Sequence, residues 1–239
     1  MAQAFVESIF DVFYLFGVIS AGTILFIKGK ENQLVKKFGL MAILLGTGDA
    51  FHLVPRMVAL WTTGLEAHAA ALGIGKFITS ITMTVFYLIL YYIWRERYNI
   101  QGRKQLTTAF WVLTATRIAI SLFPQNEWLN YNQPLLWGVL RNIPFALMGI
   151  LIIVLFAREA KKADDQIFRF MPLAIILSFG FYIPVVLFGS AIPMIGMLMI
   201  PKTLAYVWVV VMGWQLYRQV DLLNSRLETD RNSEALGAC

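Results

Sequence analysis

Seven apolar stretches alternate with short polar connections along this 239-residue chain. A helix rises about 1.5 Å per residue, so about 20 apolar residues cross the hydrocarbon core of a bilayer. We therefore predict an all-α integral membrane protein, a seven-transmembrane-helix bundle with spans of about 5–27, 38–61, 74–94, 107–123, 135–157, 169–189 and 194–217. Residues 1–221 form the transmembrane domain in this interpretation. Residues 222–239 form a polar tail that we expect to be irregular.

The positions of lysine and arginine predict the orientation of the bundle. Fifteen of the 20 lysines and arginines follow the first, third, fifth and seventh stretches, and the other connections contain none. Because cytoplasmic loops are enriched in Lys and Arg, the N-terminus is predicted outside and the C-terminus in the cytoplasm. The expected location is the plasma membrane. The sixth and seventh helices should be antiparallel neighbours, because only a tight turn at 190–193 joins them.

The composition agrees with a membrane protein and excludes other classes. Apolar residues make up 59% of the chain, charged residues only 14%, and the mean hydropathy is +0.67, which leaves no room for a sizeable soluble domain. The net charge of +6 is spread over short turns, where it would meet anionic lipid headgroups. Nucleic-acid binding is therefore disfavoured. The single cysteine, Cys239, forms no intrachain disulfide.

Ionisable side chains inside the apolar stretches are the candidate functional residues, because charges in a bilayer are costly and usually functional. In the predicted topology all of them lie in the outer half or at the midplane, which predicts one polar cavity that opens outward above an apolar floor. Lys76 begins the third helix and is expected to reach the outer surface. The other charged members are Glu7, Asp11, Asp49, Arg56, Arg117, Arg141 and Lys202, and His52 and Asn142 accompany them.

The second stretch holds the densest group of these residues. Asp49, His52 and Arg56 are spaced i, i+3 and i+7, so they line one helical face. Asp49 could accept a proton from one imidazole nitrogen and leave the other nitrogen free as a base or ligand. Arg56 could offer its planar fork to a carboxylate or phosphate. The alternative is a buried polar network that only holds helices together.

The cations outnumber the acids in the predicted cavity, and several pairings follow. Glu7 and Asp11, at i and i+4, would repel each other unless a cation from a neighbouring helix lies between them. Arg117 shares its face with Thr114 and Ser121 and should face the bundle. Lys202 is expected to pair with Asp11 or Asp49, although a Schiff base on its amine stays open.

Metal and cofactor chemistry have little support in the sequence. The chain has two histidines, and its lone cysteine lies at the opposite side of the predicted bundle. A zinc site would have to combine His52 with carboxylates, which is not the usual catalytic set. No nucleotide-binding or hydrolase motif is present. We therefore predict no metal and no cofactor.

Three functional hypotheses follow. The first is a receptor, sensor or carrier that binds a small anionic or amphiphilic ligand through Arg56, Arg117, Arg141 and Lys202, with Asn142, Glu7 and Asp11 beside them. The second is an enzyme that acts on a lipid headgroup, with His52 as acid/base and Asp49 orienting it. The third is a structural subunit whose charges only assemble helices. Membrane lipids are expected partners in every case, and a membrane or cytoplasmic protein partner stays open.

Overall fold

The computed structural model is an all-α bundle and describes residues 2–30, 32–189 and 192–237. Within these residues it contains seven α-helices, three short 3₁₀ helices and no strand. The α-helices are α1 (Ala2–Lys28), α2 (Gln33–Trp61), α3 (Ala69–Arg97), α4 (Lys104–Leu122), α5 (Leu135–Lys162), α6 (Met171–Phe188) and α7 (Met199–Gly237). The 3₁₀ helices are η1 (Pro124–Asn126), η2 (Phe168–Phe170) and η3 (Pro193–Leu198).

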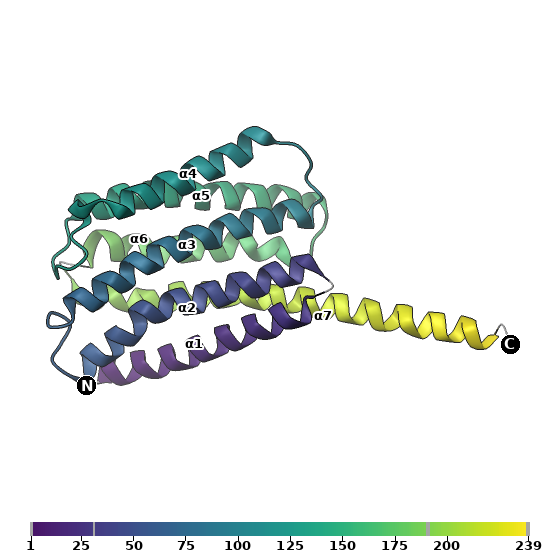
Figure 1. The fold of residues 1–239 in the computed structure, drawn as a ribbon, viewed down its shortest axis with the longest axis horizontal. Coiled ribbons are helices and arrows are strands. Elements are labelled where there is room, and N and C mark those ends of the chain that lie inside the picture. Colours follow the sequence, from purple (N-terminus) through teal and green to yellow (C-terminus); the bar gives the residue numbers. More distant parts are fainter. Residues whose placement is uncertain (1, 31, 190–191, 238–239) are drawn as a thin grey trace.

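The helices run up and down, and each lies next to its successor in the chain (Figure 1). α7 returns to contact α1 and α2, and α3 also contacts α5, so the seven helices close into one bundle. The connections alternate between the two ends of the bundle. The end that holds the basic connections lies opposite the N-terminus, as the spacing of lysine and arginine predicts, and we call it the basic end (Figure 1).

Six of the helices are long and apolar enough to cross a membrane, and α4 falls outside that set. The all-helical membrane bundle predicted from the sequence is thus supported for six of the seven spans. α4 is the shortest apart from α6 and includes Arg117 and several threonines, which lower its average hydropathy. Its length of 19 residues still corresponds to about 28 Å.

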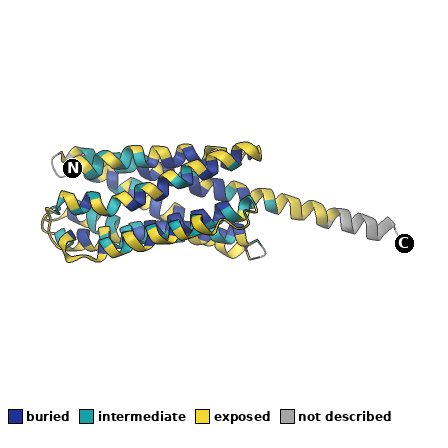
Figure 2. Cartoon of the chain, turned by 90° about the horizontal axis from the view of Figure 1, so that it is seen from above, coloured by how far each residue is buried: buried dark blue, intermediate teal, exposed yellow. Residues whose placement is uncertain are grey.

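Burial follows the pattern expected when lipid surrounds a bundle. Exposed residues line the outward faces of the helices (Figure 2). Many of them are large and apolar, among them Phe13, Phe16 and Leu136. The half near the basic end has an interior of large apolar and aromatic side chains, among them Trp94 and Phe168. These side chains form a packed apolar layer at that end of the bundle.

Polar contacts tie the connections together at the basic end. The Asn32 side chain caps α2 by accepting hydrogen bonds from the backbone N–H groups of the first turn. Ion pairs join Lys37 to Glu96, Arg97 to Asp165 and Arg103 to Glu159. These ion pairs link α2 to α3, α3 to the α5–α6 connection, and the α3–α4 connection to α5, in the region where the sequence places most of its charge.

The last span differs from the prediction in helix type at its start and in its extent at the end. The span begins at Met194, as predicted, but its first residues belong to the 3₁₀ helix η3, so α7 itself begins at Met199. The tail after 221 is not irregular: α7 continues as one helix to Gly237 and projects beyond the bundle (Figure 1). Residues 190 and 191 of the predicted tight turn, and Cys239, lie outside the described residues.

Candidate functional site

All the predicted site residues lie in the half of the bundle that contains the N-terminus, because antiparallel helices bring the start of one beside the end of the next. Apart from His52 and Lys202, they form two groups rather than one. The acidic cluster lies on α1 and α2 and consists of Glu7, Asp11, Tyr14, Asp49 and Arg56. The arginine cluster lies on α4, η1, α5 and α6 and consists of Arg117, Asn126, Arg141, Asn142 and Tyr182.

Glu7 and Arg56 form the ion pair of the acidic cluster. The Nε and Nη2 atoms of Arg56 donate to the two carboxylate oxygens of Glu7 at 3.0 and 3.2 Å, a two-pronged contact between α1 and α2. Asp11 is buried one turn below Glu7 and interacts electrostatically with Glu7, Arg56 and Asp49. Arg56 is therefore the cation expected near the two acids. Its guanidinium donates hydrogen bonds to Glu7 and interacts with Asp11 electrostatically.

Asp49 and His52 do not form the predicted pair. The Asp49 carboxylate instead accepts a hydrogen bond of 2.7 Å from the hydroxyl of Tyr14 on α1. The Nδ1 atom of His52 is buried, and no hydrogen-bond partner for it lies among the described residues. Because Asp49 is turned toward α1, the acid/base arrangement on which the enzyme hypothesis depends is not assembled.

Arg117 is the central residue of the arginine cluster. Its side chain is buried with 2% exposure, and Thr114 and Ser121 on the same face of α4 are buried with it. The prediction that this face points into the bundle is confirmed. The guanidinium carbon lies 3.5 Å from the centroid of the Phe145 ring, a cation–π contact. The Nε and Nη1 atoms are buried and have no hydrogen-bond partner among the described residues.

Arg141 and Asn142 begin α5 and have partners of their own. Arg141 Nη1 donates to the side-chain oxygen of Asn126 at 3.0 Å, and its guanidinium carbon lies 4.4 Å from the Trp128 ring centroid. Asn142 donates to the Gly138 carbonyl and accepts a hydrogen bond of 3.2 Å from the Tyr182 hydroxyl. These contacts connect α5 to the α4–α5 connection on one side and to α6 on the other.

Lys202 lies between the two clusters on the first turn of α7. Its Nζ atom is 4.8 Å from the ring centroid of Tyr182 and 5.6 Å from that of Tyr206, and the residue is buried. It interacts electrostatically with Asp49, but within the described part of the chain it forms no ion pair. The expected pairing with Asp11 or Asp49 is thus replaced by two tyrosine rings.

Sequence reasoning missed the tyrosines of this half. Tyr14 follows Glu7 and Asp11 at i+7 and i+3, so helical spacing alone could have placed it on the acidic face. Tyr87 is buried in α3 and Tyr206 is buried about two turns into α7, within the apolar spans, and their hydroxyls lie 3.2 Å apart. A tyrosine at mid-span, away from the interface that it prefers, is the signal that could have identified them.

The site offers guanidinium groups and an ammonium group among aromatic rings, which suits the binding of an anion. In the described residues, no three His, Cys, Asp or Glu side chains are placed to share a metal ion. Comparison with protein-family models, with curated proteins and with solved structures found no match for this chain.

Proposed function

We propose that this chain is a seven-span protein of the plasma membrane, with its N-terminus outside and its C-terminus in the cytoplasm, that binds a small anionic or amphiphilic ligand. It would act as a receptor, sensor or carrier. The observation that carries the proposal is the guanidinium of Arg117, which is buried while two of its nitrogens have no hydrogen-bond partner among the described residues.

Buried N–H groups of a cation need hydrogen-bond acceptors. Each buried N–H group left without an acceptor costs about 1–3 kcal/mol, so native proteins nearly always supply an acceptor, a water or an ion. The groups that interact electrostatically with Arg117 include three tyrosines and another arginine, Arg141, which has the same charge. Within the described residues Arg117 forms no ion pair with a carboxylate. An anionic ligand would supply both the acceptors and the opposite charge.

The charges of this half support a ligand with one negative charge. Leaving out Lys76, which is exposed, four buried or partly buried cations face three acids. Only one ion pair, Arg56 with Glu7, joins members of the two sets within the described residues. One negative charge near Arg117 and Lys202 would balance the difference, since unpaired charges in a low-dielectric interior are costly.

The surroundings of the two cations support a ligand with an apolar body. Phe145 covers the guanidinium of Arg117, and Tyr182 and Tyr206 flank the ammonium of Lys202. Tyr182 and Tyr206 also interact electrostatically with Arg117, so the same rings lie near both cations. A carboxylate attached to an apolar group would match cations that are surrounded by aromatic surface.

Two features support α4 as the seventh span. Its polar residues Thr114, Arg117 and Ser121 face the interior, and exposed apolar residues, among them Trp111 and Leu122, cover its outward side. Average hydropathy therefore understates how apolar its lipid-facing surface is. The orientation follows from the basic end, which would face the cytoplasm.

Cysteine labelling tests the spans and the orientation. In a Cys239→Ser background, Thr63→Cys, Gln101→Cys and Asn130→Cys place single thiols at exposed positions of three successive connections. We expect a membrane-impermeant maleimide to label positions 63 and 130 in intact cells and position 101 only after permeabilisation. Labelling of 101 and 130 from the same side would show that α4 does not cross the membrane.

Native mass spectrometry tests the ligand. The protein is extracted in a mild non-ionic detergent, and wild type is compared with Arg117→Gln, which removes the charge and keeps hydrogen-bonding groups. We expect a non-covalent anionic companion on the wild type that is absent from the variant. If both proteins show only their own covalent masses with no companion, and neither laurate nor phosphate raises the Tm of the wild type, the proposal is contradicted.

A further inference from the structure

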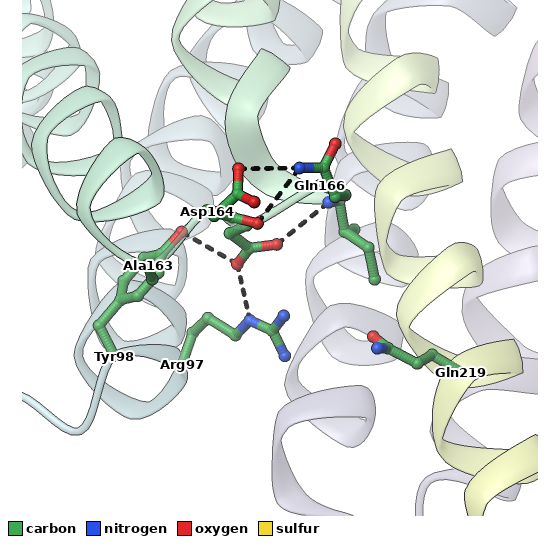
Figure 3. Close-up of a pocket in the computed structure, with 8 residues that line it drawn as sticks. Arg97, Tyr98, Ala163, Asp164, Gln166 and Gln219 are labelled. Atoms are coloured by element: carbon green, nitrogen blue, oxygen red, sulfur yellow. Dashed lines mark hydrogen bonds and ion pairs between the residues drawn. The ribbon is translucent and has the colours of Figure 1, made fainter.

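A pocket lies at the basic end, at the opposite end of the bundle from Arg117. It has a volume of about 290 Å³, at the lower limit of ordinary ligand pockets, and is formed where α3 ends, α5 connects to α6, and α7 passes (Figure 3). Its lining residues are Arg97, Tyr98, Ala163, Asp164, Asp165, Gln166, Ile167 and Gln219. This volume suits a headgroup rather than a whole lipid.

Asp165 fixes the floor of this pocket. One carboxylate oxygen accepts from the backbone N–H groups of Ile167 and Phe168, and the other accepts from Arg97 Nε at 2.8 Å and from the Tyr98 hydroxyl at 3.1 Å. Burial opposes ionisation of this carboxyl, but the hydrogen bonds outweigh it and hold the pKa of Asp165 below its usual value. All the acceptor capacity of Asp165 is therefore used inside the protein.

Arg97 supplies donors that the protein does not use. Its Nε is bonded to Asp165, and its guanidinium lies over the Phe168 ring at 5.4 Å, so the group is held in place. Its two terminal nitrogens form no hydrogen bond to the described residues, and Figure 3 shows them on the side toward Gln219. An anchored guanidinium with two free terminal nitrogens matches the oxygens of a phosphate.

Asp164 supplies a negative charge to the same pocket. Its side chain is exposed, and one carboxylate oxygen accepts a hydrogen bond from Gln166 at 2.9 Å. The exposed Arg169 donates to the other end of the Gln166 amide, so the pocket and its rim contain two arginines and two aspartates. A pocket that is neutral overall, with separate positive and negative groups, suits a zwitterion.

The location adds an apolar surface next to the polar pocket. Ile167 lines the pocket, and Phe170 and Leu173, which follow it at the start of α6, are exposed large apolar residues. Phe170 packs beside Trp208 of α7 at 5.7 Å. The apolar span that includes α6 begins at Phe168, next to the pocket. A lipid whose headgroup occupies the pocket could therefore lay its acyl chains against these exposed apolar residues.

We propose that this pocket binds the headgroup of a zwitterionic phospholipid with a primary amine, the phosphatidylethanolamine type, from the leaflet at the basic end. Arg97 contacts the phosphate, Asp164 contacts the ammonium, and the acyl chains follow the surface of α6. The proposal is independent of the anion site, because no residue is shared between the two.

Native mass spectrometry with short-chain phosphatidylethanolamine and phosphatidylglycerol of equal chain length tests the proposal. Wild type should retain more phosphatidylethanolamine. Asp164→Asn should lower that preference about threefold, the size expected when a solvent-exposed ion pair is lost. The variant should keep its backbone, because Asn tolerates the left-handed conformation of residue 164, whose φ is 46°.

Two further variants make the result specific. Arg97→Lys keeps a charge beside Asp165 but removes the fork, so it should weaken retention of both lipids. Glu66→Gln, at the opposite end of the bundle, is the matched control and should leave both unchanged. Equal retention of the two lipids by wild type, or the same preference in wild type and Asp164→Asn, would overturn the proposal. So would free phosphoethanolamine binding as tightly as the lipid, since that would indicate a soluble ligand.

Discussion

Replacement of Arg117 by methionine should stabilise the ligand-free protein. The residue is buried with 2% exposure, and its Nε and Nη1 atoms have no hydrogen-bond partner among the described residues. Two such groups cost about 2–6 kcal/mol. The contact with the Phe145 ring at 3.5 Å returns about 2 kcal/mol, and methionine keeps a similar length of apolar side chain. The balance favours Arg117→Met by about 2 kcal/mol.

The assay is thermal unfolding in a non-ionic detergent after delipidation. For a chain of this length, a gain of about 2 kcal/mol corresponds to a rise in Tm of about 4–8 °C. The same variant should lose any stabilisation by the bound anion, which for wild type reaches about 2.7 kcal/mol at a ligand concentration 100 times Kd. Stability and binding would then change in opposite directions, as expected where a site is strained for function.

Arg141→Met is the matched control, because its guanidinium donates to the buried Asn126 side chain. This variant should lower the free energy of unfolding by the value of a charged hydrogen bond, about 1.5–3 kcal/mol, and should therefore lower Tm. A lower Tm for Arg117→Met in the ligand-free protein would refute the reasoning, since it would mean that the protein itself already satisfies the guanidinium.

Four more substitutions, at three positions, test contacts described above by the same unfolding assay. Arg56→Met removes the guanidinium from the buried Glu7 carboxylate and should destabilise by about 2–4 kcal/mol, the opposite sign to Arg117→Met. Asp165→Asn should destabilise by about 1–3 kcal/mol at neutral pH. Because the pKa of Asp165 is lowered from its usual 3.8, its contribution is present above that pH and is lost as the pH falls through the folded-state value, so variant and wild type should converge in acid. Tyr182→Phe should cost about 1 kcal/mol through the Asn142 hydrogen bond, and Tyr182→Leu should cost more because it also removes the ring beside Lys202. An acid-independent loss for Asp165→Asn, or equal losses for the two Tyr182 variants, would contradict these assignments.

The helices and their order could be predicted because each depends on local sequence. A run of apolar residues bounded by charged or turn residues specifies a long helix, and the alternation of lysine and arginine assigns the connections to ends of the bundle. The inward face of α4 was also predictable, since Thr114, Arg117 and Ser121 repeat at helical spacing. The residue at which α7 begins could not be predicted, because η3 is a local change from 3₁₀ to α-helix within one apolar run.

The partners inside the bundle could not be predicted, because they depend on how each helix is rotated about its axis. Asp49 and His52 share one face of α2, but that face packs against Tyr14, whose hydroxyl donates a hydrogen bond to the Asp49 carboxylate. Lys202 was expected beside an acid and instead lies between Tyr182 and Tyr206. Spacing along one helix identifies which residues face inward, and only the packing of neighbours decides which of them meet.

The two sides of the bundle are filled by different means, and this decides where space for a guest can open. α1, α2 and α3 approach through glycines: a Cβ on Gly22 or Gly39 would overlap the facing backbone, and one on Gly75 would overlap Phe51 and His52. α3, α5, α6 and α7 instead meet through rings such as Tyr87 and Phe145. Backbones in direct contact leave no side chain that can turn aside, whereas an aromatic ring can rotate about two bonds. The first three helices therefore form a rigid wall within the membrane, and we expect the side-chain movement that admits a ligand beside Arg117 to come from the aromatic side.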